Sequence, residues 1–161
     1  MILVLIHSDD EGVVSRALRS FPHVELGRGI AVTWEPREVV ERALEKAKRE
    51  LLRQWEAEGS GPAFEYAVLP LSEEQYNALR HMVRRALDEE AAALAKELRR
   101  LAAEMRRGGR RAHELKAKFG RLAKSTAQIN EAAAKLGLYT SAIADLQEAF
   151  KEANAEYLKL K

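Results

Sequence analysis

Residues 72–111 read SEEQYNALRHMVRRALDEEAAALAKELRRLAAEMRRGGRR, with no glycine or proline before residue 108. Ser72 and Gln75 have the spacing of a capping box, in which two side chains satisfy backbone groups at a helix start. Apolar side chains then recur in alternating steps of four and three from Leu87 to Met105, which is typical of a coiled-coil seam. The stretch therefore predicts one helix of about 35 residues, or roughly 50 Å, that ends at a pair of glycines.

Two further seams follow the glycine pair. The first spans residues 112–136 and the second residues 143–160, with Thr140 or Ser141 available to cap the last helix. A two-glycine connection between two long seams favours an antiparallel hairpin, because each apolar stripe then covers the other. We therefore expect residues 72–161 to form a helical domain: a long antiparallel helical hairpin and a third helix, arranged as a bundle or coiled coil. The seams can close either within one chain or against a second copy.

The first 71 residues alternate between strand and helix patterns. Short apolar or alternating segments predict strands, and amphipathic segments between them predict helices. The strands are expected at residues 1–7, 23–26, 30–34 and 64–69, and the helices at residues 8–21 and 36–58. Strand, helix, two strands, helix, strand is the order of a ferredoxin-like βαββαβ unit. The expected fold class is therefore α+β, with a ferredoxin-like domain over residues 1–71. Many unrelated functions share this unit, including small-ligand sensing, so the fold alone selects none of them.

Four polar side chains, SDDE at residues 8–11, follow the first predicted strand. Ser8 and Glu11 have capping-box spacing, and Asp9 and Asp10 place negative charge in the first helical turn, where the helix dipole favours it. Acidic residues at the end of a strand also hold Mg²⁺ in some proteins, but no second acidic cluster with ligand spacing occurs in the sequence. We therefore interpret these residues as a helix cap and expect no metal and no other cofactor.

Composition excludes several classes of protein and site. The chain has 161 residues, and its hydrophobic fraction of 47% is ordinary for a folded protein and too high for a disordered one. It has no cysteine, so disulfides, thiol nucleophiles and zinc–thiolate sites are excluded. The longest aliphatic run, residues 1–6, is far shorter than the roughly 20 residues that span a bilayer, and no basic segment precedes it. We therefore expect a cytoplasmic protein with no membrane partner, and the low Asn, Gln and Cys content suggests a thermophilic source.

The charge is nearly balanced overall but unevenly placed. The chain carries 27 Lys and Arg against 25 Asp and Glu, a formal net charge of +2. Residues 1–71 have a net charge of −3, residues 72–161 of +5, and residues 96–124 alone of +8. At the predicted hairpin tip, residues 106–111, the first two arginines end a helix, where cations are favoured. The next two begin a helix, where the helix dipole disfavours cations. Exposure to solvent alone therefore does not explain why arginines stand there.

This basic region predicts a nucleic-acid contact. The planar fork of arginine suits phosphate oxygens, and further cations continue the positive surface down the second helix. The candidate nucleic-acid-binding residues are Arg106, Arg107, Arg110, Arg111, Lys116, Lys118, Arg121 and Lys124. Contacts to phosphates carry little sequence information, so we expect binding to DNA or RNA with little sequence preference. An acidic protein surface is the other partner that this charge fits.

The leading hypothesis is a non-enzymatic nucleic-acid-binding accessory protein, with no catalytic residues. Its alternative is an assembly or adaptor protein that uses its heptad faces to join a partner or to form a homo-oligomer, without nucleic acid. Arg107 and His113 resemble the arginine–histidine pair of the HEPN ribonucleases, a resemblance limited to these two residues. It implies phosphodiester cleavage without a metal, although that family usually has a polar residue where this chain has Gly108.

Overall fold

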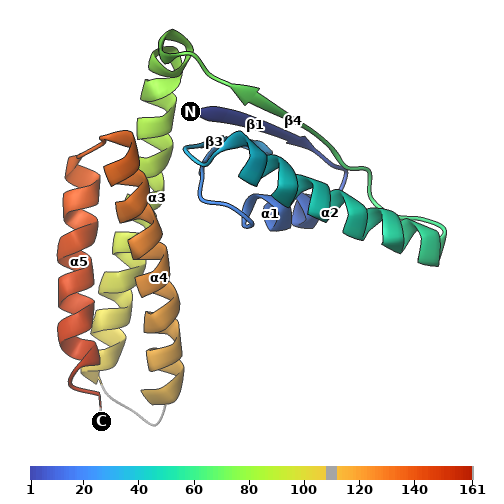
Figure 1. The fold of residues 1–161 in the computed structure, drawn as a ribbon. Coiled ribbons are helices and arrows are strands. Elements are labelled where there is room, and N and C mark those ends of the chain that lie inside the picture. The colour runs from blue at the N-terminus through green and yellow to red at the C-terminus, as the bar shows by residue number, and fades with distance from the viewer. Residues whose placement is uncertain (108–111, 161) are drawn as a thin grey trace. The chain divides into compact units, whose positions relative to one another are not determined.

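The structure is a computed structural model that describes residues 1–107 and 112–160 (Figure 1). It confirms the expected α+β class, since the described residues form a four-stranded antiparallel sheet and five helices. The strands are β1 (Ile2–His7), β2 (Val24–Gly27), β3 (Ile30–Thr33) and β4 (Glu65–Pro70). The helices are α1 (Glu11–Leu18), α2 (Arg37–Glu58), α3 (Glu73–Arg107), α4 (Ala112–Leu136) and α5 (Ser141–Tyr157).

Contacts divide the chain into two compact units, unit 1 (Met1–Val83) and unit 2 (Arg84–Lys161). The division falls inside α3, so this helix belongs in part to each unit. The predicted domain boundary between residues 71 and 72 lies just before the start of the same helix. The two domains at residues 1–71 and 72–161 stay a prediction, because a helix that runs through the division does not show that either part folds alone.

The sheet of unit 1 has the strand order β2-β3-β1-β4, and every neighbouring pair is antiparallel. β1 therefore lies between two partners, with Val4 opposite Ala31 of β3 and opposite Val68 of β4. Its side chains at positions 2, 4 and 6 are buried, and those at positions 3 and 5 are half-buried. A strand that is covered on one face and partly covered on the other has no place for polar side chains, which explains its continuous apolar sequence.

The core of unit 1 lies between the sheet and the two helices α1 and α2. It is formed by buried residues of β1, β3 and β4 and of both helices, and by Phe21, which follows α1. These residues are Ile2, Val4, Ile6, Val14, Ala17, Leu18, Phe21, Ala31, Val40, Leu44 and Val68. The α2 members of the core recur at helical spacing, so the opposite side of α2 faces away from the sheet.

The cap of α1 differs from the prediction. The N-cap is Asp10, whose backbone is extended (φ −109°, ψ 114°) and whose carboxylate accepts a hydrogen bond from the Gly12 N–H at 2.7 Å. The Ser8 hydroxyl accepts from the Asp10 N–H at 3.2 Å, so it is already occupied before the helix begins. The capping box predicted between Ser8 and Glu11 is therefore wrong, and the helix is shorter than predicted, ending at Leu18.

The helix starts expected at Ser72 and Thr140 are confirmed. The Ser72 hydroxyl accepts from the Gln75 N–H at 3.1 Å while the Gln75 side chain accepts from the Ser72 N–H at 2.8 Å, which is the reciprocal pattern of a capping box. The Thr140 hydroxyl accepts from the Ile143 N–H at 3.4 Å at the start of α5. In both cases the two partners of the bond lie within one turn of helix, so the sequence alone contains the whole motif.

The three helical segments of unit 2 lie side by side (Figure 1). The Phe119 ring of α4 stacks on two rings of α5, at centroid distances of 5.7 Å from Phe150 and 4.4 Å from Tyr157. Most predicted seam positions of this unit are buried, namely Leu87, Ala91, Leu94, Leu98, Leu101, Met105, Phe119, Leu122, Thr126, Ile129, Ala133, Leu136, Ile143, Leu146 and Ala153. Within the described ranges, no helix combines the length and the apolar character needed to cross a membrane.

Candidate nucleic-acid interface

The candidate cations occupy two helices of unit 2. Arg106 and Arg107 are the last two residues of α3, and the other described candidates are Lys116, Lys118, Arg121 and Lys124 of α4. The remaining two candidates, Arg110 and Arg111, lie outside the described residues. The structure therefore describes six of the eight candidates. These six differ in whether they form an ion pair with another described residue.

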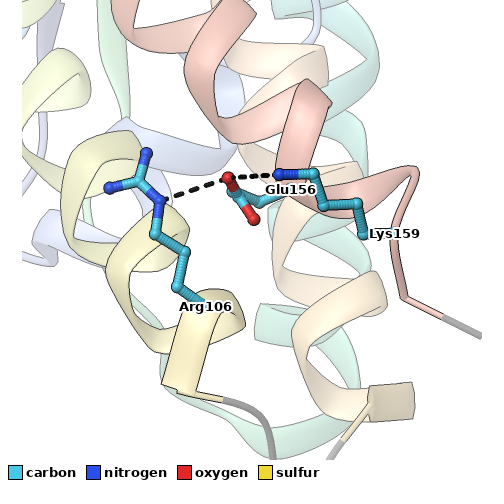
Figure 2. A network of polar contacts seen from close by, with 3 residues as sticks. All are labelled: Arg106, Glu156 and Lys159. Atoms are coloured by element: carbon cyan, nitrogen blue, oxygen red, sulfur yellow. Dashed lines mark hydrogen bonds and ion pairs between the residues drawn. The ribbon is translucent and has the colours of Figure 1, made fainter.

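Arg106 is held by an acidic side chain of α5. Its Nε donates to the Glu156 carboxylate at 3.2 Å, and the Lys159 ammonium donates to the same carboxylate oxygen at 3.0 Å. Figure 2 shows the three side chains pointing toward one another from α3, from α5 and from the segment after α5. The hydrogen bonds from Lys159 and Arg106 lower the pKa of Glu156 below its ordinary value. Arg106 thus links the end of α3 to the end of α5.

Two other cations of the basic region also have partners across the bundle. The Lys118 ammonium of α4 lies 3.5 Å from the Glu104 carboxylate of α3. Arg99 of α3 donates through both terminal nitrogens to the two carboxylate oxygens of Asp145 in α5, one of these bonds measuring 2.9 Å. The hydrogen bond from Arg99 lowers the pKa of Asp145. Lys118 and Arg99 thus join pairs of helices, and an anionic ligand would have to compete with their carboxylate partners.

The other candidates form no ion pair with any described residue. Arg107, Arg121 and Lys124 are exposed, and Lys116 is half-buried. Successive residues of a helix are about 100° apart around the axis, so Arg121 and Lys124 lie on the side of α4 opposite the seam residue Phe119, and Lys116 lies between that side and Phe119. We call these three residues the α4 cation face.

Along α4, the stretch between Glu114 and Glu131 carries no negative charge, and small residues lie near the α4 cation face. Residues 115–130 contain four cations and no Asp or Glu. Ala117, Gly120 and Ala127 are exposed between the cations, and a side-chain carbon at Gly120 would meet nothing within 4 Å. A phosphate backbone could therefore approach the helix closely. The face spans eight residue steps, or roughly 12 Å of helix, a length of duplex that carries about seven phosphate charges.

Arg107 and His113, the pair that resembles the HEPN ribonucleases, lie at the end of α3 and near the start of α4, and both side chains are exposed. Their connection lies outside the described residues, so the structure does not test their relative placement, and the expectation of no catalytic residues stays a prediction. Among residues 1–107 and 112–160, no three His, Asp or Glu side chains gather as a metal site would require.

The acidic partners on α5 are the feature that sequence reasoning missed. Asp145, Glu148, Glu152 and Glu156 follow one another at steps of three, four and four, which places them along one line of the helix. The first and last of these accept from α3 arginines, and all but Glu156 raise the pKa of Arg99. The spacing is visible in the sequence and predicts an acidic stripe along the helix. It does not predict which other helix the stripe faces.

Comparison of the chain with protein-family models, with curated proteins and with solved structures gave no match. The functional argument therefore rests on the geometry of the described residues.

Proposed function

We propose that this chain is a non-enzymatic nucleic-acid-binding accessory protein whose α4 cation face contacts phosphates. The observation that carries the proposal is the contrast within one basic region. Arg99, Arg106 and Lys118 are tied to carboxylates, whereas the α4 cation face has no partner among the described residues. If the basic region served only to hold the helices together, we would expect each of its cations to form an ion pair with a carboxylate.

Two structural explanations fail for the α4 cation face. The helix dipole favours cations within the last turn of a helix, but Arg121 and Lys124 lie in the middle of α4. Pairing along the helix also gives no reason, because the positions three residues apart, Lys118, Arg121 and Lys124, carry like charges. Such pairs destabilise a helix by a few tenths of a kcal/mol each. With an anionic ligand bound, the contribution of these neighbouring cations to stability would become favourable.

The expected binding mode is electrostatic. No aromatic side chain belongs to the α4 cation face, since Phe119 is stacked inside unit 2, so bases have nothing there to stack on. Phosphate contacts fix position and carry no sequence information. We therefore expect similar affinities for different sequences, and a strong loss of affinity with salt because bound cations release counterions from the nucleic acid.

The test is a triple variant, Lys116→Ala, Arg121→Ala and Lys124→Ala, titrated with mixed-sequence DNA and RNA at 50 and 200 mM salt. Each lost phosphate contact lowers the slope of log affinity against log salt by about 0.9, so three contacts lower it by roughly 2.7. The matched control removes three other cations of unit 2: Arg84→Ala, Arg85→Ala and Lys151→Ala. An equal slope in the two variants, or no binding by the wild-type chain, would refute the proposal.

The ferredoxin-like assignment of residues 1–71 is part of the proposal. Its support is the strand order β2-β3-β1-β4 with antiparallel neighbours and a helix in each crossover connection. In this proposal the unit is a docking or dimerising platform for the helical arm.

The adaptor alternative uses the heptad faces, but most seam residues are already buried within the single chain. Sedimentation of the full chain tests it, because assembly through those faces predicts a stable oligomer.

A further inference from the structure

A second row of cations lies on α2, in unit 1. Arg42, Lys46, Arg49 and Arg53 follow one another at steps of four, three and four, which aligns them along one side of the helix. All four are exposed, and none forms an ion pair with another described residue. At about 100° per residue this line lies opposite Leu44, a fully buried core residue. We call the four residues the α2 ridge.

Acidic residues of α2 lie beside the ridge, and two of them have partners other than the ridge cations. Glu41 accepts from Arg37 at 2.7 Å, and Glu45 accepts from the Tyr66 hydroxyl of β4. Burial and the hydrogen bond to Glu45 raise the pKa of Tyr66 to about 12. The contact with Tyr66 draws the Glu45 carboxylate toward β4. Glu38, Glu50 and Glu56 also lie three or four residues from ridge cations but form no ion pair with them in the described structure. Successive cations of the ridge are themselves three or four residues apart, and like charges at that spacing destabilise a bare helix.

A groove between α1 and α2 lies beside the ridge and adds to its charge. It encloses about 230 Å³ over a floor of small side chains such as Ala17, Ala43 and Ala47. Arg16 of α1 and Lys46 of the ridge line it from opposite sides, and Glu50 is the acidic residue among its lining. The small floor lets a sugar–phosphate backbone approach the cations closely.

We propose that the α2 ridge, together with Arg16, is a second phosphate-binding surface that contacts the same nucleic acid as the α4 cation face. This inference rests on the proposed function. The ridge spans eleven residue steps, or roughly 16 Å, alongside which a duplex carries about ten phosphate charges. The net charge of −3 over residues 1–71 concealed the ridge, because that sum combines its four cations with all the acidic residues of the region.

Two surfaces on one chain strengthen binding to a long nucleic acid more than either would alone. Once one surface is bound, the other meets the ligand at a high effective concentration. A nucleic acid too short to reach both surfaces gains nothing from the second. The ridge therefore affects long ligands more strongly than short ones.

The test uses the full chain with Arg42→Ala, Arg49→Ala and Arg53→Ala, three exposed changes to the best helix former. Its matched control, Arg28→Ala, Arg37→Ala and Lys48→Ala, removes the same charge from other positions of unit 1. Affinity for a long mixed-sequence DNA duplex is measured at 50 and 200 mM salt, and circular dichroism confirms that both variants are folded. Loss of three contacts lowers the salt slope by roughly 2.7, so between the two salt concentrations the wild-type chain loses about 40-fold more affinity than the ridge variant.

The outcomes separate this inference from the proposed function. A reduced slope in the ridge variant, with the slope of the control unchanged, supports the second surface. If the ridge variant matches its control while the α4 variant loses affinity, the ridge is a solvated helix face and the inference fails alone. If the wild-type chain binds no nucleic acid at 50 mM salt, both fail together.

Discussion

Replacing Phe119 by alanine tests whether unit 2 is held together as the structure shows. The Phe119 side chain is 6% exposed, and its ring stacks between Phe150 and Tyr157 at interplanar angles of 17° and 21°. Burial of a phenylalanine contributes about 1.5–3 kcal/mol, and each aromatic pair adds about 0.5–1.5 kcal/mol. Together with the cavity left behind, we expect Phe119→Ala to lower the free energy of unfolding by about 4 kcal/mol.

The assay is thermal and urea unfolding followed by the helical circular dichroism signal. For a unit of this size, a loss of about 4 kcal/mol lowers the melting temperature by roughly 15–30 °C. Tyr139→Ala is the matched control, since Tyr139 belongs to the same unit but is 81% exposed, and it should change stability by less than about 0.5 kcal/mol. A Phe119→Ala variant within about 1 kcal/mol of this control would show that α4 and α5 do not pack through the aromatic stack.

Two further predictions concern the hairpin of unit 1 and the ion pairs of unit 2. Gly29 has φ +71°, and an added side-chain carbon would lie 2.1 Å from the Ile6 carbonyl oxygen, so Gly29→Ala should cost about 3 kcal/mol or more in urea unfolding. Gly27→Ala has open space and should cost less than about 1 kcal/mol, and similar losses in both variants would contradict the hairpin geometry. The lowered pKa values of Asp145 and Glu156 mean that their stabilisation is present above the ordinary carboxyl values of 3.8 and 4.5 and disappears as the pH falls below them. The urea midpoint of unit 2 should therefore drop with acid less steeply in Asp145→Asn than in wild type, and an unchanged acid dependence would argue against the pair with Arg99.

Features encoded within one turn of chain were the most predictable. The long helix was expected from residue 72 to residue 107 and is found at Glu73–Arg107, because neither glycine nor proline interrupts it and both capping partners are local. The cap of α1 was misassigned although it is equally local. Ser8 and Asp10 are both good caps by residue type, and the backbone conformation that decides between them depends on where the chain leaves β1.

The candidate site could be predicted from the sequence as a positively charged region. Which of its cations form ion pairs and which do not could not be predicted. Sequence spacing cannot tell that Arg106 is held by Glu156, fifty positions away, while Arg121 has no partner in the described part of the chain. That distinction depends on which faces of α3 and α5 meet, which is a property of tertiary packing. The α2 ridge was missed for a different reason: summing charge over residues 1–71 combined faces of the fold that a ligand would meet separately.

The central position of β1 has a consequence for how the chain is made. β1 is synthesised long before its partner β4, since His7 pairs with Glu65. Until β4 emerges, one edge of an apolar strand stays open, and open edges are templates for pairing with other chains. Closing so long a loop also costs chain entropy and slows folding. A nascent or truncated chain that stops before residue 65 is thus aggregation-prone. In unit 2, by contrast, α4 and α5 follow one another along the chain and stack through Phe119, so their contact closes a much shorter loop.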